Sequence, residues 1–227
     1  MSEKPPTLVF DLDGTLVDTA RDLTGALNAV LSAEGMQPVR HEDALGMVGQ
    51  GARAMLAAGA VHNGTPLDED TLDRLMARFI DHYDAHIADH ARPYPGAVQA
   101  LDRFAAEGWR LAVCTNKLEG LSKSLLTRLG LADRFAFIAG QDTFSVRKPD
   151  PGHVVETIRA AGGDPGRAVM VGDSEIDVGA AKAAGVPVIA VTFGYSQKPV
   201  AELGADVLID HYDALYDEVS SLMARAE

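Results

Sequence analysis

From about residue 95 onward, short apolar runs alternate with amphipathic helical patterns, and no other feature of the sequence restricts the fold as strongly. Strands that alternate with helices form a parallel sheet, because each helix is the crossover between two strands. We therefore predict an α/β fold, a doubly wound parallel sheet with helices on both faces. The expected strands are 8–10, 110–115, 135–140, 168–173, 187–193 and 207–210, and the expected helices are 97–107, 119–129, 151–161, 175–184 and 212–225.

The segment between the first expected strand and the rest of the sheet has a different pattern. Residues 18–90 lack β-branched runs, and we expect successive helices over 18–34, 41–47, 51–61 and 68–90. The return connection, 91–96, has the sequence ARPYPG and is rich in turn-forming residues. We therefore expect a core of residues 1–17 and 91–227, interrupted by a helical cap of residues 18–90.

Composition argues against several classes of protein. The 227 residues carry a formal net charge of −13 without a basic patch to offset it, which disfavours a nucleic-acid partner. The longest apolar run, 186–193, is too short to cross a bilayer, and the N-terminal MSEKPPT lacks the apolar core of a signal peptide. We expect a cytoplasmic protein, monomeric or homodimeric, with no membrane partner. The single cysteine, Cys114, lies in an apolar run and is expected in the core.

The first expected strand ends in two aspartates. Asp11 and Asp13 follow the apolar run 8–10, and side chains two residues apart on an extended chain point the same way. Two adjacent carboxylates repel each other, so the pair needs a cation between them or a raised pKa on one of them. Ligands of open parallel sheets bind beyond the carboxyl ends of the strands. The other polar residues expected at this edge are Thr115, Asn116, Lys148, Asp173 and Asp177.

These residue types fit the hydrolysis of a phosphate monoester. Asp11 is the expected nucleophile, because a carboxylate that attacks phosphorus replaces one difficult displacement by two easier ones through an aspartyl-phosphate. Asp13 is the expected general acid and base, which protonates the leaving oxygen and later takes a proton from water. Phosphate monoesters are inert and need strong electrostatic help. Mg²⁺ bound by Asp11 and Asp173, with support from Asp177, would supply part of that help.

The remaining polar residues at this edge are expected to contact the phosphate. Gly14 lets the chain turn beside it, so that backbone N–H groups reach its oxygens. Thr115 and Asn116 can donate further hydrogen bonds, and Lys148 neutralises charge that develops on the transferred group. Each residue type alone is also common in turns, helix caps or exposed surfaces. The combination at strand ends and helix starts is what favours a catalytic site.

Four segments resemble the motifs of the haloacid dehalogenase-like phosphohydrolases, in the family's order and over nearly the whole chain. They are DLDGTLVDT at 11–19, VCTNK at 113–117, KPDP at 148–151 and VGDSEIDVGAAKAAG at 171–185. The resemblance implies a Rossmann-like core with a helical cap after the first motif, and it implies the roles given above. It adds that Asp13 contacts magnesium through its backbone carbonyl, which leaves its carboxylate for proton transfer.

Within that family, VDTARDL at 17–23 and GMVGQGARAML at 46–56 are similar to the phosphoglycolate phosphatase branch, which implies 2-phosphoglycolate as the substrate. We expect Gly46, Gly49 and Gly51 to form a loop before a helix, where N–H groups bind an anion when the cap closes. Arg53 is expected to pair with the substrate's carboxylate. A flexible hinge beside a surface arginine is the alternative interpretation.

Other functions share parts of this pattern. A sugar phosphomutase of the β-phosphoglucomutase type has the same core motifs, as does a phosphatase for another sugar or nucleotide phosphate. A non-catalytic phospho-accepting receiver also uses an aspartate, a threonine and a lysine, but its acceptor closes the third strand and it lacks such an insertion. A ligand-sensing relative without catalysis is expected to lack one of the key residues. All are present here: Asp11, Asp13, Lys148 and Asp173.

The expected cap helix 68–90 contains three histidines four residues apart. Such spacing would place His82, His86 and His90 along one helix face, where a transition metal can bind. Aspartates are interleaved with them, which is typical of a solvated face. We therefore favour a solvated helix over a metal site.

Overall fold

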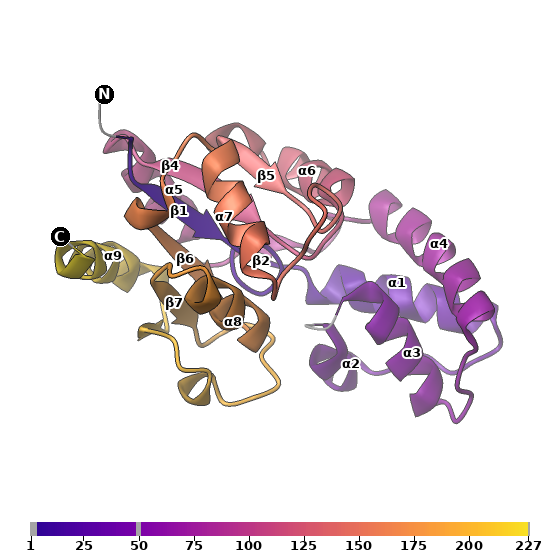
Figure 1. Cartoon of the computed structure of the whole chain (residues 1–227). Helices are drawn as coiled ribbons and strands as arrows, with labels where there is room; N and C mark the ends of the chain where they lie inside the picture. The colour runs from indigo at the N-terminus through magenta and orange to yellow at the C-terminus, as the bar shows by residue number, and fades with distance from the viewer. Residues whose placement is uncertain (1–3, 49–50, 227) are drawn as a thin grey trace. The chain divides into compact units, whose positions relative to one another are not determined.

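The computed structural model describes residues 4–48 and 51–226 (Figure 1). The chain divides into two compact units. The first, the core unit, comprises Met1–Val17 and Pro93–Glu227, and the second, the cap unit, comprises Asp18–Arg92. The chain passes between them at β2 (Val17–Asp18) and β3 (Arg92–Pro93), which pair with each other.

The core unit is built on a six-stranded parallel sheet with the strand order β5-β4-β1-β6-β7-β8. All six strands expected from the sequence are present, with ends shifted by one or two residues. Their bounds are Thr7–Phe10 for β1, Arg110–Cys114 for β4, Phe137–Ala139 for β5, Ala168–Gly172 for β6, Val188–Val191 for β7 and Val207–Ile209 for β8. The fold class predicted from the alternating pattern is therefore confirmed.

Helices cover both faces of this sheet (Figure 1). On one face α7 and α8 pack together, and on the other α5 packs beside α9, while α6 contacts the edge strand β5. The helices are α5 (Ala97–Ala106), α6 (Glu119–Arg128), α7 (Pro151–Ala160), α8 (Glu175–Ala183) and α9 (Leu215–Ala226). Short 3-10 helices are η1 (Ala132–Arg134), η2 (Pro165–Arg167), η3 (Val200–Glu202) and η4 (Tyr212–Ala214).

The central strand β1 determines where a site can form. All four of its residues are buried, as expected for a strand covered by helices on both faces. From β1 the strand order runs to β4 and β5 on one side and to β6, β7 and β8 on the other. Ligands of doubly wound sheets bind where the order reverses, beyond the carboxyl ends of the strands. That position is the end of β1, between β4 and β6.

The cap unit is helical, as predicted. Its helices are α1 (Ala20–Ala33), α2 (His41–Val48), α3 (Ala52–His62) and α4 (Glu69–Ala85). The first helix, α1, packs against each of the other three, and its Leu27 and Leu31 lie close to Gly59 of α3. None of the described helices of either unit is long and apolar enough to span a membrane.

The expected helix over 68–90 was too long, because α4 ends at Ala85. A buried carboxylate binds the chain a few residues beyond that end. Asp22 of α1 accepts hydrogen bonds from the backbone N–H groups of His90 and Ala91 at 2.8–3.1 Å, so these amides do not extend the helical ladder. His90 therefore lies outside the helix that carries His82, and the expected row of three histidines on one helix face is wrong.

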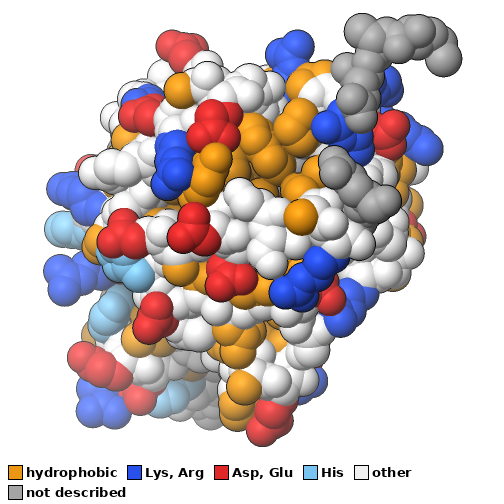
Figure 2. All heavy atoms as spheres, turned by 90° about the vertical axis from the view of Figure 1, so that its left-hand side faces the viewer, with side chains coloured by type: hydrophobic (Ala, Val, Ile, Leu, Met, Phe, Trp, Pro, Cys, Tyr) orange, Lys and Arg blue, Asp and Glu red, His pale blue; other side chains and the backbone are white. Residues whose placement is uncertain are grey.

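The charged side chains on one face of the molecule are mixed in sign. In Figure 2, Lys and Arg side chains are interspersed with Asp and Glu side chains, with hydrophobic side chains between them. Nucleic-acid sites present clustered basic residues on one face. The face drawn in Figure 2 shows no such cluster, in keeping with the net charge of −13.

Replacement of Asp22 by alanine should destabilise the cap unit. The change leaves the buried N–H groups of His90 and Ala91 without their acceptor, at a cost of about 1–3 kcal/mol. Urea unfolding followed by circular dichroism measures the loss. The matched control is Asp81→Ala on the exposed face of α4, which should change the free energy of unfolding by less than about 0.5 kcal/mol. Equal effects of the two variants would refute the structural role of Asp22.

Candidate active site

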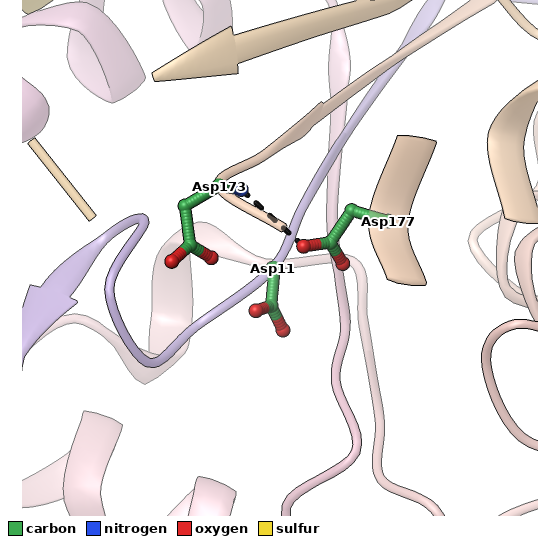
Figure 3. Close-up of side chains that lie close together, drawn as sticks. All are labelled: Asp11, Asp173 and Asp177. Carbon is green, nitrogen blue, oxygen red and sulfur yellow. Dashed lines mark hydrogen bonds between the residues drawn. The ribbon is translucent and has the colours of Figure 1, made fainter. Parts of the chain in front are cut away.

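Three carboxylates from separate elements meet at the carboxyl ends of β1 and β6 (Figure 3). Asp11 follows β1, Asp173 follows β6, and Asp177 lies in the first turn of α8. One oxygen of each carboxylate lies within 4.8 Å of one oxygen of each of the others. The polar residues of the first and fourth sequence motifs are thus brought to one edge of the sheet.

Lys148 is buried among these carboxylates. Its Nζ lies 2.9 Å from Asp11 Oδ1 and 2.6 Å from Asp177 Oδ1, and its side chain is only 2% exposed. Burial alone would lower the pKa of Lys148, but the negative charges of Asp11 and Asp177 outweigh burial and raise it. Lys148 is therefore a fixed positive charge next to the expected nucleophile.

The backbone of Lys148 is held from both sides. The side-chain amide of Asn116 donates to the Lys148 carbonyl at 2.9 Å, and Lys148 N–H donates to His153 Nδ1 at 3.2 Å. The second ring nitrogen of His153 lies 3.1 Å from the Gly140 carbonyl oxygen, so the imidazole is neutral with its proton on Nε2. Asn116 and His153 thus fix the segment that carries the lysine.

Asp173 is oriented by two hydrogen bonds. The hydroxyl of Thr15 donates to Oδ1 at 3.1 Å, and Tyr195 N–H donates to Oδ2 at 2.6 Å. Burial, with the charges of Asp177 and Asp11, raises the pKa of Asp173 well above its usual range despite these bonds. A bound cation would favour the ionised form of this carboxyl group.

Gly14 occupies a position that no larger residue can take. Its φ is +81°, and a Cβ atom there would lie 2.6 Å from Asp173 Oδ2 and 2.8 Å from Tyr195 Cδ2. Its own N–H donates to the Val17 carbonyl at 3.0 Å, within the turn. The close approach to Asp173 explains the glycine, while contact of this backbone with a phosphate stays a prediction.

Asp177 has both carboxylate oxygens engaged. Oδ1 pairs with Lys148, and Oδ2 accepts from Asp173 N–H and from the N–H and hydroxyl of Ser174 at 2.6–3.3 Å. The Ser174 hydroxyl accepts in turn from Asp177 N–H, which completes a capping box at the start of α8. These contacts suit Asp177 for holding Lys148 and the Asp173 turn. Support of a metal by Asp177 stays a prediction.

Asp11 is a buried carboxylate paired with the ammonium group of Lys148. Its Oδ1 is buried and lies 2.9 Å from Lys148 Nζ. Burial raises the pKa of Asp11 to about 6; Lys148 opposes the increase, and the charges of Asp177 and Asp13 add to it. A buried carboxylate with a perturbed pKa fits both a metal ligand and a nucleophile.

Asp13 has a partner that the sequence interpretation missed. The ammonium group of Lys117 lies 2.9 Å from each carboxylate oxygen of Asp13. Lys117 belongs to the quoted segment VCTNK, but only Thr115 and Asn116 of that segment received a role. A lysine two residues after a strand-end threonine is the only signal, and it resembles any lysine that begins a loop.

The donor set fits a divalent cation. Two ammonium groups face four carboxylates, so a formal charge of −2 remains if all are ionised. One divalent ion would neutralise that charge, and carboxylate oxygens are the ligands that hard cations prefer. The four carboxylates belong to Asp11, Asp13, Asp173 and Asp177, and the ammonium groups to Lys117 and Lys148.

The end of β4 presents the remaining predicted residues of the core unit. Thr115 is buried, and its hydroxyl oxygen accepts from Lys117 N–H at 3.2 Å. That oxygen can still donate its own hydrogen. Asn116 Oδ1 is buried without a hydrogen-bond partner among the described residues. Cys114, as predicted, is buried in the core, and burial raises the pKa of its thiol to about 11.

The predicted anion loop of the cap unit differs from expectation. Gly46 lies inside α2, so a loop formed by all three glycines is wrong, and Gly49 lies outside the described residues. Gly51 is the N-cap of α3 with φ +87°. Arg53 pairs with two carboxylates of α4, those of Glu69 and Asp73. Binding of a substrate by Gly49, Gly51 or Arg53 stays a prediction.

Comparison with known proteins gives matches over nearly the whole chain. Residues 8–191 match the haloacid dehalogenase-like hydrolase family. A phosphoglycolate phosphatase of Mesorhizobium japonicum is 49% identical over 221 residues, which cover 97% of each chain. The crystal structure of a predicted phosphoglycolate phosphatase from Haemophilus somnus superposes with a TM-score of 0.87 at 26% identity, over 94% of this chain and 97% of that one. CbbY from Rhodobacter sphaeroides, in complex with phosphate, gives 0.79 at 26% identity, over 93% and 96%.

The Rossmann-like sheet, whose central strand ends in carboxylates beside a buried lysine, has the arrangement expected of a hydrolase that acts on phosphate esters. The matches make the assignment specific, because the chain belongs to the haloacid dehalogenase-like hydrolase family and is a phosphoric monoester hydrolase. The family resemblance drawn from the four sequence motifs is confirmed.

His153 should make the stability of the core unit depend on pH. Burial, together with the charge of Lys148, lowers the pKa of His153 from its ordinary 6.5 to about 4. Between these values the unfolded state binds a proton that the folded state excludes, so stability is lost as pH falls from about 6.5 toward 4. Glutamine keeps a donor and an acceptor but does not titrate. Between pH 7 and pH 5 the free energy of unfolding should therefore fall by about 1–2 kcal/mol less in His153→Gln than in wild type. Urea unfolding at both pH values measures this, and an unchanged pH dependence would exclude His153 as its source.

Proposed function

We propose that this chain is a magnesium-dependent phosphatase that hydrolyses 2-phosphoglycolate through an aspartyl-phosphate formed on Asp11. The observation that carries the proposal is the carboxylate of Asp11, which is buried at the end of β1 and lies 2.9 Å from the ammonium group of Lys148. The 49% identity to a phosphoglycolate phosphatase over nearly the full length supports the substrate.

The proposed reaction has two chemical steps, in which Asp11 and Asp13 have different roles. A carboxylate oxygen of Asp11 forms a bond to phosphorus as the ester P–O bond breaks, and Asp13 gives its proton to the departing oxygen. Water then attacks the same phosphorus, Asp13 takes the water's proton, and the bond to Asp11 breaks. The fixed charge of Lys148 beside Asp11 favours the anionic phosphoryl group throughout.

Magnesium, held by Asp11, Asp173 and the backbone carbonyl of Asp13 with support from Asp177, would neutralise phosphate charge as a Lewis acid. The chain's own contribution is to hold these oxygens in place. Thr15 and the Tyr195 amide fix Asp173. Thr115, at the end of β4, keeps a hydroxyl hydrogen that can be donated to a phosphate oxygen.

The choice of substrate rests on the relatives and on the cap unit. 2-Phosphoglycolate carries a carboxylate, which Arg53 would bind after exchanging its present partners Glu69 and Asp73. The Rhodobacter sphaeroides protein CbbY was solved with phosphate bound, which supports a phosphate ester as the general substrate class. A sugar phosphomutase is the alternative that shares all four motifs.

Replacement of Asp11 by asparagine should abolish turnover. The amide keeps the shape of the side chain but is a poor nucleophile, so we expect a loss of about a thousandfold or more in kcat. Phosphate release is measured from 2-phosphoglycolate, glucose 6-phosphate, glucose 1-phosphate and a nucleoside monophosphate. The matched control is Asp133→Asn at an exposed site of the core unit, which should keep full activity.

The wild-type protein should give its highest kcat/KM with 2-phosphoglycolate. Migration of the phosphoryl group on glucose 1-phosphate without release of phosphate would replace the hydrolase proposal with the mutase. Substantial turnover by Asp11→Asn would remove Asp11 as the nucleophile, whatever the substrate.

Magnesium should stabilise the protein through Asp173. At about a hundred times its Kd the ion adds about 2.7 kcal/mol, which corresponds to a rise in Tm of about 5 °C or more for a chain of this size. The rise should be larger at pH 7.5 than at pH 5, because burial raises the pKa of Asp11 to about 6 and protons compete with the ion below that value. Thermal unfolding with MgCl₂ and with EDTA measures it. Asp173→Asn should lose the rise and Asp133→Asn should keep it; a rise that survives in Asp173→Asn would contradict the site.

A further inference from the structure

Lys117 is a buried cation that the proposed chemistry does not yet use. Its side chain is 5% exposed, and its ammonium group lies 2.9 Å from Asp13 Oδ1 and 2.9 Å from Asp13 Oδ2. The contact joins residues 104 positions apart in the sequence, from the loop after β4 to the loop after β1. An exposed lysine would lose side-chain entropy by holding one such geometry, but here burial restricts it already.

The backbone of Lys117 is fixed as firmly as its side chain. Its N–H donates to the Thr115 hydroxyl oxygen at 3.2 Å, and its carbonyl accepts from Gln141 N–H at 2.9 Å. Thr115 N–H is bound in turn to the Ala139 carbonyl at 3.0 Å. The backbone that carries the ammonium group is therefore held by the ends of two paired strands, β4 and β5.

The two buried lysines contact different carboxylates. Lys148 lies against Asp11 and Asp177, whereas Lys117 lies against both oxygens of Asp13. Asp13 is the more exposed of the two aspartates at the end of β1, with 21% of its side chain exposed against 13% for Asp11. A symmetric contact of both carboxylate oxygens with one cation favours a single rotamer of Asp13.

We propose that Lys117 is a positioning residue for proton transfer by Asp13. The inference rests on the proposed phosphatase function, in which Asp13 protonates the leaving oxygen. As the bond from Asp11 to phosphorus forms and the ester P–O bond breaks, the proton moves from Asp13 to the departing alkoxide oxygen. Lys117 stays protonated. It holds the carboxyl group of Asp13 in the orientation for proton transfer. Its positive charge lies next to the carboxylate that forms when the proton has left.

A positioning role predicts that the effect of Lys117 depends on the leaving group. An alkyl ester such as 2-phosphoglycolate has a strongly basic leaving oxygen that needs a proton, whereas p-nitrophenyl phosphate releases a stabilised phenolate that needs little. We expect Lys117→Met to lower kcat/KM about a hundredfold for 2-phosphoglycolate and less than about fivefold for p-nitrophenyl phosphate. The parameter kcat/KM is chosen because it reports the steps up to departure of the leaving group.

The controls separate this role from general damage to the site. Lys123→Met makes the same change on the exposed face of α6, where Lys123 pairs with Glu119, and should leave both substrates unaffected. Lys117→Gln keeps a hydrogen-bond donor without the charge and should show the same dependence on the leaving group with a smaller loss. Circular dichroism and Tm show that each variant is folded, and Lys117→Gln carries the test if Lys117→Met is not.

The outcomes distinguish this inference from the function on which it rests. Equal losses with both esters, or no loss with either, would overturn the role of Lys117 while wild type remains active and Asp11→Asn remains inactive. A wild-type protein that hydrolyses neither ester would overturn the proposed function, and the role of Lys117 would fall with it. A loss confined to 2-phosphoglycolate supports both.

Discussion

The site depends on one interaction, the pairing of the buried ammonium group of Lys148 with two carboxylates. Asp11 and Asp177 lie within ion-pair distance of it, and all three side chains are largely withdrawn from solvent. Removing one partner from such a group leaves an uncompensated buried charge, which commonly costs about 3–5 kcal/mol. The fold therefore has to set the geometry around Lys148. It does so through the hydrogen bonds of Asn116 and His153 to the backbone of Lys148.

The sheet brings the remaining groups to the same place. Because β1 is buried on both faces and lies between β4 and β6, the residues that follow these three strands share one edge. Small residues let the segments approach closely, and Gly14 beside Asp173 is the clearest case. The site is thus assembled from segments distant in sequence, each rigid because a strand or a helix start holds it.

Sequence patterns were sufficient for what depends on local periodicity. The six strands, the helices of the core unit and the helical character of the cap unit follow from apolar spacing and turn residues, which act within a few positions. The four motifs also located the carboxylates and Lys148, because polar residues at the ends of buried strands stand out. The hydrogen bonds that hold the chain beyond α4 could not be found in this way, since they come from Asp22, which lies 68 residues from His90.

Side-chain partners were the part that local patterns could not supply. Lys117 and Asp13 are 104 residues apart, and nothing near either residue indicates the other. The pairing of Arg53 with Glu69 and Asp73, and the engagement of both oxygens of Asp177, likewise arise only when helices pack. Gly46 was misplaced for a related reason, since a glycine tolerated inside a helix looks the same in sequence as one in a loop.

The hydrogen bonds of Asp22 have a consequence for how the insertion is built. They fasten the first turn of α1 to the residues just before β3, so the two ends of the inserted segment are held together by the segment itself. The two points at which the core unit is interrupted therefore lie close together, whatever the number of residues inserted between them. The length of the inserted segment can therefore change without drawing β1 away from β4, so the insertion and the parallel sheet are structurally independent.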